Sequence, residues 1–149
     1  MAHLVDTSVL SRLANMADAR FSIAARAVAE LHGRGEVLHI TSQNLIEFRN
    51  MATRPVAANG LGLVPVDAEG KAAIFAQSFP LLPETPAIYP AWKALVEHLG
   101  VIGKQVHDAR LVAVCHAHGV THLLTFNVGH FKRLVGFGPS VTVVDPATV

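Results

Sequence analysis

Three acidic residues stand where short apolar stretches give way to helix-like sequence. Asp6 follows Leu4-Val5, Glu47 lies in the segment Q-N-L-I-E-F, and Asp108 lies in V-H-D-A-R-L-V. Each has apolar neighbours rather than the mixed charges of a solvated helix face. A single acid in such a place can simply cap a helix or offset its dipole. It can also bind a metal ion or phosphate at the carboxyl end of a parallel strand. Local sequence leaves both interpretations open.

Taken together, the three acids indicate a site for a hard divalent cation. Mg²⁺ prefers oxygen ligands, and two or three carboxylates suit it or Mn²⁺. Carboxylates packed together raise one another's pKa unless a cation neutralises them. A cation held there would polarise a phosphodiester and activate water as the nucleophile. The sequence does not say whether one ion or two would bind.

Alternating strand-like and helix-like segments must position these acids. The pattern predicts a three-layer α/β fold with a parallel sheet, in a single domain spanning residues 1–149. Thr41-Ser42 and Asp67 are expected to cap helices, and proline-rich residues 80–90 read as a linker. The expected strands are 2–5, 37–40, 120–125 and 141–144. The expected helices are 8–15, 21–31, 43–52, 67–79, 91–99 and 105–118, with a loop at 53–66 and a short helix or turn at 128–134.

Composition narrows the class of protein. Of the 149 residues, 51% are apolar and 15% are charged, which excludes a disordered or coiled-coil chain. The net charge of +1 excludes a protein that holds nucleic acid by charge alone. No apolar run approaches the roughly 20 residues of a membrane span, and no signal peptide is evident. The single cysteine, Cys115, rules out an internal disulfide and fits a reducing compartment, so we expect a cytoplasmic protein.

Four segments together resemble the PIN-domain family, and most of all the VapC-like toxins of type II toxin–antitoxin pairs. They are L-V-D-T-S-V-L, S-Q-N-L-I-E-F, H-D-A-R-L-V-A-V and T-H-L-L-T-F-N-V-G-H-F, in that order. The resemblance implies an α/β/α domain with a mostly parallel sheet of four or five strands. It also implies a metal-dependent endoribonuclease, a small antitoxin partner and a homodimer. In this reading Asp6, Glu47 and Asp108 are the metal-binding and catalytic residues.

The last segment departs from the family pattern. Many members carry a further acid there, whereas this chain has Asn127 and His130 at the two candidate positions. We expect the loss to weaken a second metal position, and Asn127→Asp to lower the metal requirement, with His130→Asp as the competing candidate. Thr7, Ser8 and Thr125 carry hydroxyls beside the acids. These can orient a ligand, although helix capping explains Thr7 and Ser8 equally well.

Two other functions stay open. One is a PIN fold with impaired catalysis that serves as an RNA-binding or interaction module. The other is a metal-dependent phosphohydrolase for small substrates, although no second Asp follows two residues after Asp6, as the D-x-D-x-T phosphatase pattern requires.

Three further features of the sequence have simpler explanations. Cys115, His116, His118 and His122 match no usual zinc spacing. Cys115 is expected in the core. Tyr89 and Trp92 are expected to pack rather than to stack on bases.

Overall fold

Four parallel strands form the centre of the protein, whose computed structural model describes residues 1–149. The strands lie in the order β2-β1-β3-β4. His3 of β1 pairs with Leu38 of β2 and His122 of β3, and His122 pairs in turn with Thr142 of β4. The predicted three-layer α/β fold with a parallel sheet is confirmed, with four strands. Their bounds are Ala2–Val5 (β1), Val37–His39 (β2), His122–Leu124 (β3) and Thr142–Val144 (β4).

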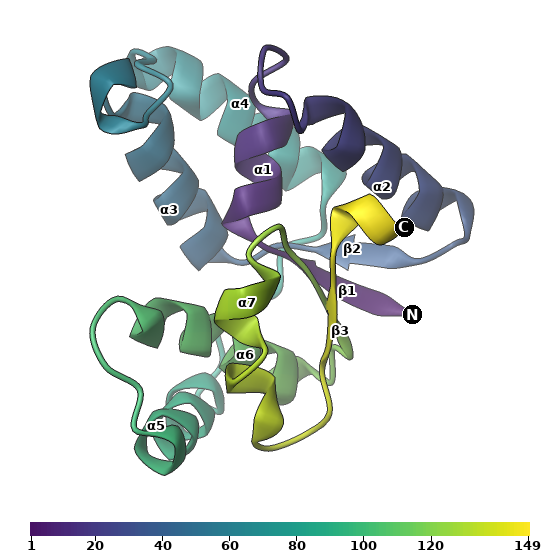
Figure 1. The fold of residues 1–149 in the computed structure, drawn as a ribbon, viewed down its shortest axis with the longest axis vertical. Coiled ribbons are helices and arrows are strands. Elements are labelled where there is room, and N and C mark those ends of the chain that lie inside the picture. Colours follow the sequence, from purple (N-terminus) through teal and green to yellow (C-terminus); the bar gives the residue numbers. More distant parts are fainter.

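Helices cover both faces of this sheet. In Figure 1 the first four helices lie above the strands and α5, α6 and α7 lie below them. The upper group is α1 (Thr7–Leu13), α2 (Phe21–Gly33), α3 (Ser42–Thr53) and α4 (Pro65–Ser78). The lower group is α5 (Ile88–Leu99), α6 (Gln105–His118) and α7 (Val128–Phe131). The chain also forms short 3₁₀ turns at Val56–Ala58, Leu134–Gly136 and Pro146–Thr148.

The sheet separates two hydrophobic cores. Successive residues of a strand point to opposite faces, so each strand contributes to both cores. Leu4 packs in the cluster that contains Leu95 of α5 and Leu111 of α6. Its neighbour Val5 packs in the cluster that contains Phe48 of α3. The strands therefore hold the two helical layers at a fixed distance from each other.

Several element boundaries differ from the sequence-based expectation. Helix α5 begins at Ile88 rather than at residue 91, because Pro90 falls in its first turn, where proline is tolerated. Helix α4 begins at Pro65, so Asp67 lies in its first turn and the expected cap there is wrong. The third strand begins at His122 rather than at residue 120. No helix is both long enough and apolar enough to span a membrane.

The cap of α3 and the burial of three side chains test the predictions made for individual residues. Thr41 caps α3 as predicted: its hydroxyl accepts from the Asn44 amide, while the Asn44 side chain accepts from the Thr41 N–H. Cys115 is fully buried, as expected. Trp92 packs against the lower core, as predicted. Tyr89 is 65% exposed, and it packs on the Trp92 ring rather than in a core.

Candidate active site

The carboxyl end of β1 lies at the point where the chain connections diverge. Strand β1 has β2 on one side and β3 on the other, so the connections leave it in opposite directions. In open parallel sheets ligands bind at such a switch point, beyond the carboxyl ends of the strands. Asp6 follows β1 and Thr125 follows β3, and the Asp6 N–H donates to the Leu124 carbonyl at 2.9 Å. These two residues mark the floor of the candidate site.

Asp6 is held as an oriented carboxylate and does not cap α1 through its side chain. It occupies the N-cap position, yet its carboxylate makes no capping hydrogen bond. Its Oδ2 atom instead accepts from the Ser8 and Thr125 hydroxyls, each at 2.7 Å. Its Oδ1 atom accepts no hydrogen bond, and the residue is only 4% exposed. Two donors thus fix one oxygen and leave the other free for a ligand.

The hydroxyls of Ser8 and Thr125 are themselves tied to the backbone. Ser8 Oγ accepts from the Phe126 N–H at 3.1 Å, and Thr125 Oγ1 accepts from the Asn127 N–H at 2.9 Å. Because each hydroxyl already accepts from an amide, its proton is directed to Asp6.

Glu47 reaches the site from the second turn of α3. Its Oε2 accepts from the Thr7 hydroxyl at 2.8 Å, and its Oε1 accepts from Gln43 Nε2 at 2.7 Å. Thr7 in turn accepts from Asn44 Nδ2 at 3.2 Å. The capped start of α3 therefore sets the orientation of the carboxylate.

Asp108 carries the electrostatic signature of crowded acids. Burial raises its pKa most, Asp6 and Glu47 raise it further, and the result is about 6. His130 opposes the shift, and its Nδ1 lies 3.6 Å from Asp108 Oδ2. Asp6 and Glu47 thus lie near enough to Asp108 to act on its charge, and Asp108 also contacts His130.

Asn127 and His130 differ in how they meet this site. His130 is 59% exposed but contacts Asp108. Asn127 is exposed, and its side chain makes no hydrogen bond at the start of α7. Of the two positions, residue 130 is the one whose side chain reaches an acid.

The three acids match a divalent cation in donor chemistry. Asp6 offers a free oxygen, and burial together with the charges of Asp6 and Glu47 raises the pKa of Asp108. Even so, no group of three His, Cys, Asp or Glu side chains is drawn close enough to hold a metal ion. The acids converge on one region without forming a closed ligand cage.

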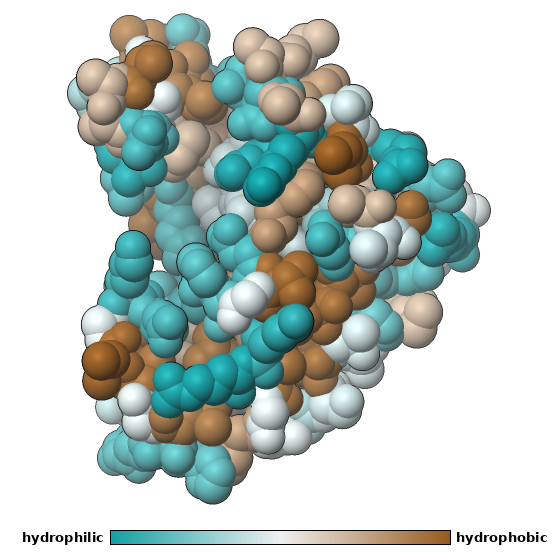
Figure 2. All heavy atoms as spheres, viewed as in Figure 1, coloured by the Kyte–Doolittle hydropathy of each residue, from teal (hydrophilic) through white to brown (hydrophobic).

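A groove of about 380 Å³ runs from Glu47 between α3 and α6. Gln43 crosses it, donating to Glu47 Oε1 and to the His107 carbonyl, while its own oxygen accepts from Arg110 at 3.2 Å. Figure 2 shows this side of the molecule indented between the two groups of helices. The sequence patterns did not single out Gln43, Asn44 or Arg110 as site residues. Gln43 stands one helical turn before Glu47, a spacing that places both side chains on one face.

Comparison with known proteins agrees with this architecture. The PIN-domain family model matches residues 3–136, so the chain belongs to the PIN-domain family. The structure of VapBC2 from Rickettsia felis bound to a promoter DNA fragment has a similar fold, with a TM-score of 0.72 and 17% identity. That match covers 97% of this chain and 98% of the other.

Two other VapBC structures are similar. VapBC-1 from nontypeable Haemophilus influenzae gives a TM-score of 0.67 at 16% identity, covering 98% of each chain. DNA-bound VapBC from Salmonella typhimurium gives a TM-score of 0.69 at 14% identity, and the match covers 98% of each chain. Comparison with curated protein sequences finds no match.

Proposed function

We propose that this PIN domain is a metal-dependent endoribonuclease and the toxin of a toxin–antitoxin pair. The observation that carries the proposal is the convergence of Asp6, Glu47 and Asp108 at the switch point of the sheet. Membership of the PIN family, whose members are generally nucleases, supports the reaction class. The similarity to VapBC structures supports an antitoxin partner for this chain.

The three acids would hold one Mg²⁺ or Mn²⁺ ion or more. A bound ion of this kind polarises the phosphodiester and lowers the pKa of water. Ser8 and Thr125 prevent the Asp6 carboxylate from rotating, and Thr7 and Gln43 do the same for Glu47. Asp108 keeps part of its proton near pH 6 and must release it before it can act as an anionic ligand.

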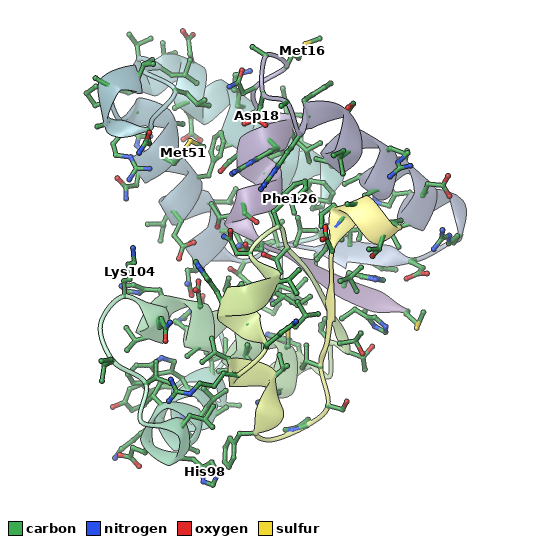
Figure 3. The ribbon with its side chains drawn as sticks, viewed as in Figure 1. Met16, Asp18, Met51, His98, Lys104 and Phe126 are labelled. Carbon is green, nitrogen blue, oxygen red and sulfur yellow. The ribbon has the colours of Figure 1, made fainter.

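Positive charge near the segment that follows Thr125 suits a polyanionic substrate. The guanidinium groups of Arg12 and Arg20 lie 5.8 and 5.4 Å from the centre of the Phe126 ring, directly after Thr125 in the chain. Figure 3 shows Phe126 beside α1 and Lys104 projecting into the gap below α3. These cations could bind phosphates on either side of the cleaved bond.

A second candidate function is an RNA-binding or interaction module with impaired catalysis. Both oxygens of Glu47 are already hydrogen-bonded, and the acids form no closed metal cage. Replacement of the fourth acid by Asn127 or His130 points the same way. This alternative retains the basic surface and the partner but not the reaction.

The decisive experiment titrates Mg²⁺ and Mn²⁺ against cleavage of RNA and of a small phosphate ester. We expect metal-dependent cleavage of RNA alone, abolished in Asp6→Asn and Asp108→Asn. The matched control is Asp67→Asn, an exposed acid on α4, which should cut at the wild-type rate. RNA binding without cleavage at any metal concentration would support the second candidate. Cleavage of the ester alone would identify a phosphohydrolase.

The partner and the assembly are tested separately. We propose that a small antitoxin encoded next to this chain binds it and blocks the site, and that the toxin itself is a homodimer. Co-purification of the two proteins with loss of RNA cleavage is the expected result. A purified toxin that stays monomeric in light scattering at all concentrations would refute the homodimer.

A further inference from the structure

A second pocket, of about 330 Å³, adjoins the groove beside Glu47. Its lining is Glu84, Thr85, Ile88, Tyr89, Trp92 and Arg110. Arg110 also lines the first groove, so the two hollows share one wall. Arg110 donates a hydrogen bond to the Gln43 side chain at 3.2 Å, and Gln43 donates to Glu47 at 2.7 Å. The second pocket therefore lies close to the candidate catalytic acids.

Two aromatic rings form one side of the second pocket. Tyr89 and Trp92 stack with their centroids 5.7 Å apart and their planes tilted by 28°. The Trp92 ring is anchored, since its Nε1 donates to the Val106 carbonyl at 2.8 Å. Tyr89 is 65% exposed and belongs to neither core. The anchored Trp92 and the exposed Tyr89 beside it form the kind of aromatic surface on which proteins stack single-stranded bases.

Polar groups at the rim give the pocket a preference among bases. Hydrogen bonds from Ser42 to Oε1 and from Arg110 to Oε2 lower the pKa of Glu84, so its carboxylate is ionised. Each of these oxygens keeps a second lone pair that can accept from a ligand. Thr85 Oγ1 lines the same pocket and has no hydrogen-bond partner. A carboxylate pairs best with an edge that carries two adjacent N–H donors. Among the four RNA bases only guanine, with N1–H and N2–H₂, presents such an edge.

We propose that this pocket binds a nucleobase of the RNA next to the cleaved phosphodiester, with guanine preferred. The base stacks on Tyr89 and Trp92, and Glu84 accepts from its Watson–Crick edge. Arg110 lies between the base and the catalytic acids, where it can contact the intervening phosphate. The inference rests on the proposed ribonuclease function and specifies its substrate.

Trp92 is the only tryptophan of the chain, so its fluorescence reports on this pocket. The experiment titrates the full-length protein with GMP, AMP, CMP and UMP in the absence of divalent metal. We expect a saturable change with GMP at lower concentration than with the other three. Tyr89→Ala should weaken GMP binding about tenfold, because one base–aromatic stack is lost. Tyr89→Phe, which keeps the ring, should bind as the wild type does.

Two variants separate the pocket from general effects. Glu84→Gln should reduce GMP affinity to that of AMP, since the anionic acceptor is gone. Ile74→Ala, at a residue of α4 that is 60% exposed, should leave every titration unchanged. Circular dichroism should show the same thermal midpoint for Tyr89→Ala and Tyr89→Phe, so that a lost signal is not lost folding.

The possible failures are distinguishable. A protein that cleaves RNA but gives no saturable signal with any nucleotide would overturn the pocket and leave the ribonuclease intact. A protein that binds GMP but never cleaves RNA would support the pocket and refute the reaction. Equal binding of all four nucleotides would overturn the guanine preference. A Trp92 signal that follows protein concentration instead of nucleotide would identify a contact between copies and overturn the proposal.

Discussion

Asp108 is the acid of the site whose pKa the fold shifts most clearly. Its pKa rises from 3.8 to about 6 on folding, first through burial and then through Asp6. The folded protein therefore holds a proton that the unfolded chain releases, and the associated stability is lost as the pH rises from about 4 to about 6. At pH 7 and without metal, we expect the free energy of unfolding of Asp108→Asn to exceed that of the wild type by on the order of 2 kcal/mol.

This increase in the free energy of unfolding should vanish below about pH 4, where Asp108 is protonated in both the folded and the unfolded state. Urea denaturation across this range measures it, with Asp67→Asn as the exposed control. An increase that is the same at every pH would show that the ionisation of buried Asp108 is not its source.

His130 and Asn127 allow a second test at the residue scale. From sequence, Asn127→Asp is the smaller change and the first choice for restoring a fourth acid. The contact of His130 with Asp108 now makes His130→Asp the variant with the larger expected effect. Stronger metal binding in either variant would appear as a lower Mg²⁺ or Mn²⁺ concentration for half-maximal RNA cleavage. An unchanged metal requirement in both variants would mean that three acids suffice.

At the scale of elements, the capped start of α3 positions Glu47. Three hydrogen bonds join Thr41 and Asn44, and the Asn44 side chain in turn donates to Thr7. Thr41→Ala should lower the free energy of unfolding by about 1 kcal/mol, as expected for a lost N-cap. It should also raise the metal concentration needed for cleavage, because the support of Glu47 loosens. Thr53→Ala, at the other end of α3, should change neither; an equal effect there would refute a specific role for the cap.

At the scale of the whole molecule, the site depends on two cores that meet only through the sheet. Phe48 of α3 is fully buried and packs edge-to-face on Phe75 of α4, with centroids 5.1 Å apart. Phe48→Ala should therefore lower the free energy of unfolding by about 3–5 kcal/mol in urea denaturation. Ile46→Ala, two residues away and 70% exposed, is the matched control, with a change within about 0.5 kcal/mol. Similar losses for both would contradict the assignment of the core.

The sequence by itself determined the fold class, the order of the elements, the Thr41 cap and the family. These follow from apolar periodicity, capping residues and four short motifs, all of which are local properties of the chain. The helix starts expected at residues 67 and 91 are wrong, because Pro65 and Pro90 both lie within first turns, which proline tolerates.

Only the tertiary structure decided how the site residues meet. The pairing of β1 with β3 brings the Thr125 hydroxyl to Asp6 across 119 positions of the chain. The arrangement of the two helical layers brings Arg110 of α6 within hydrogen-bonding distance of Gln43 of α3, and Tyr89 remains exposed at the neighbouring pocket. Such contacts depend on strand order and on the packing of whole layers, which no local pattern encodes. For the same reason, the aromatic pair read from sequence as packing residues became the candidate base-binding pocket.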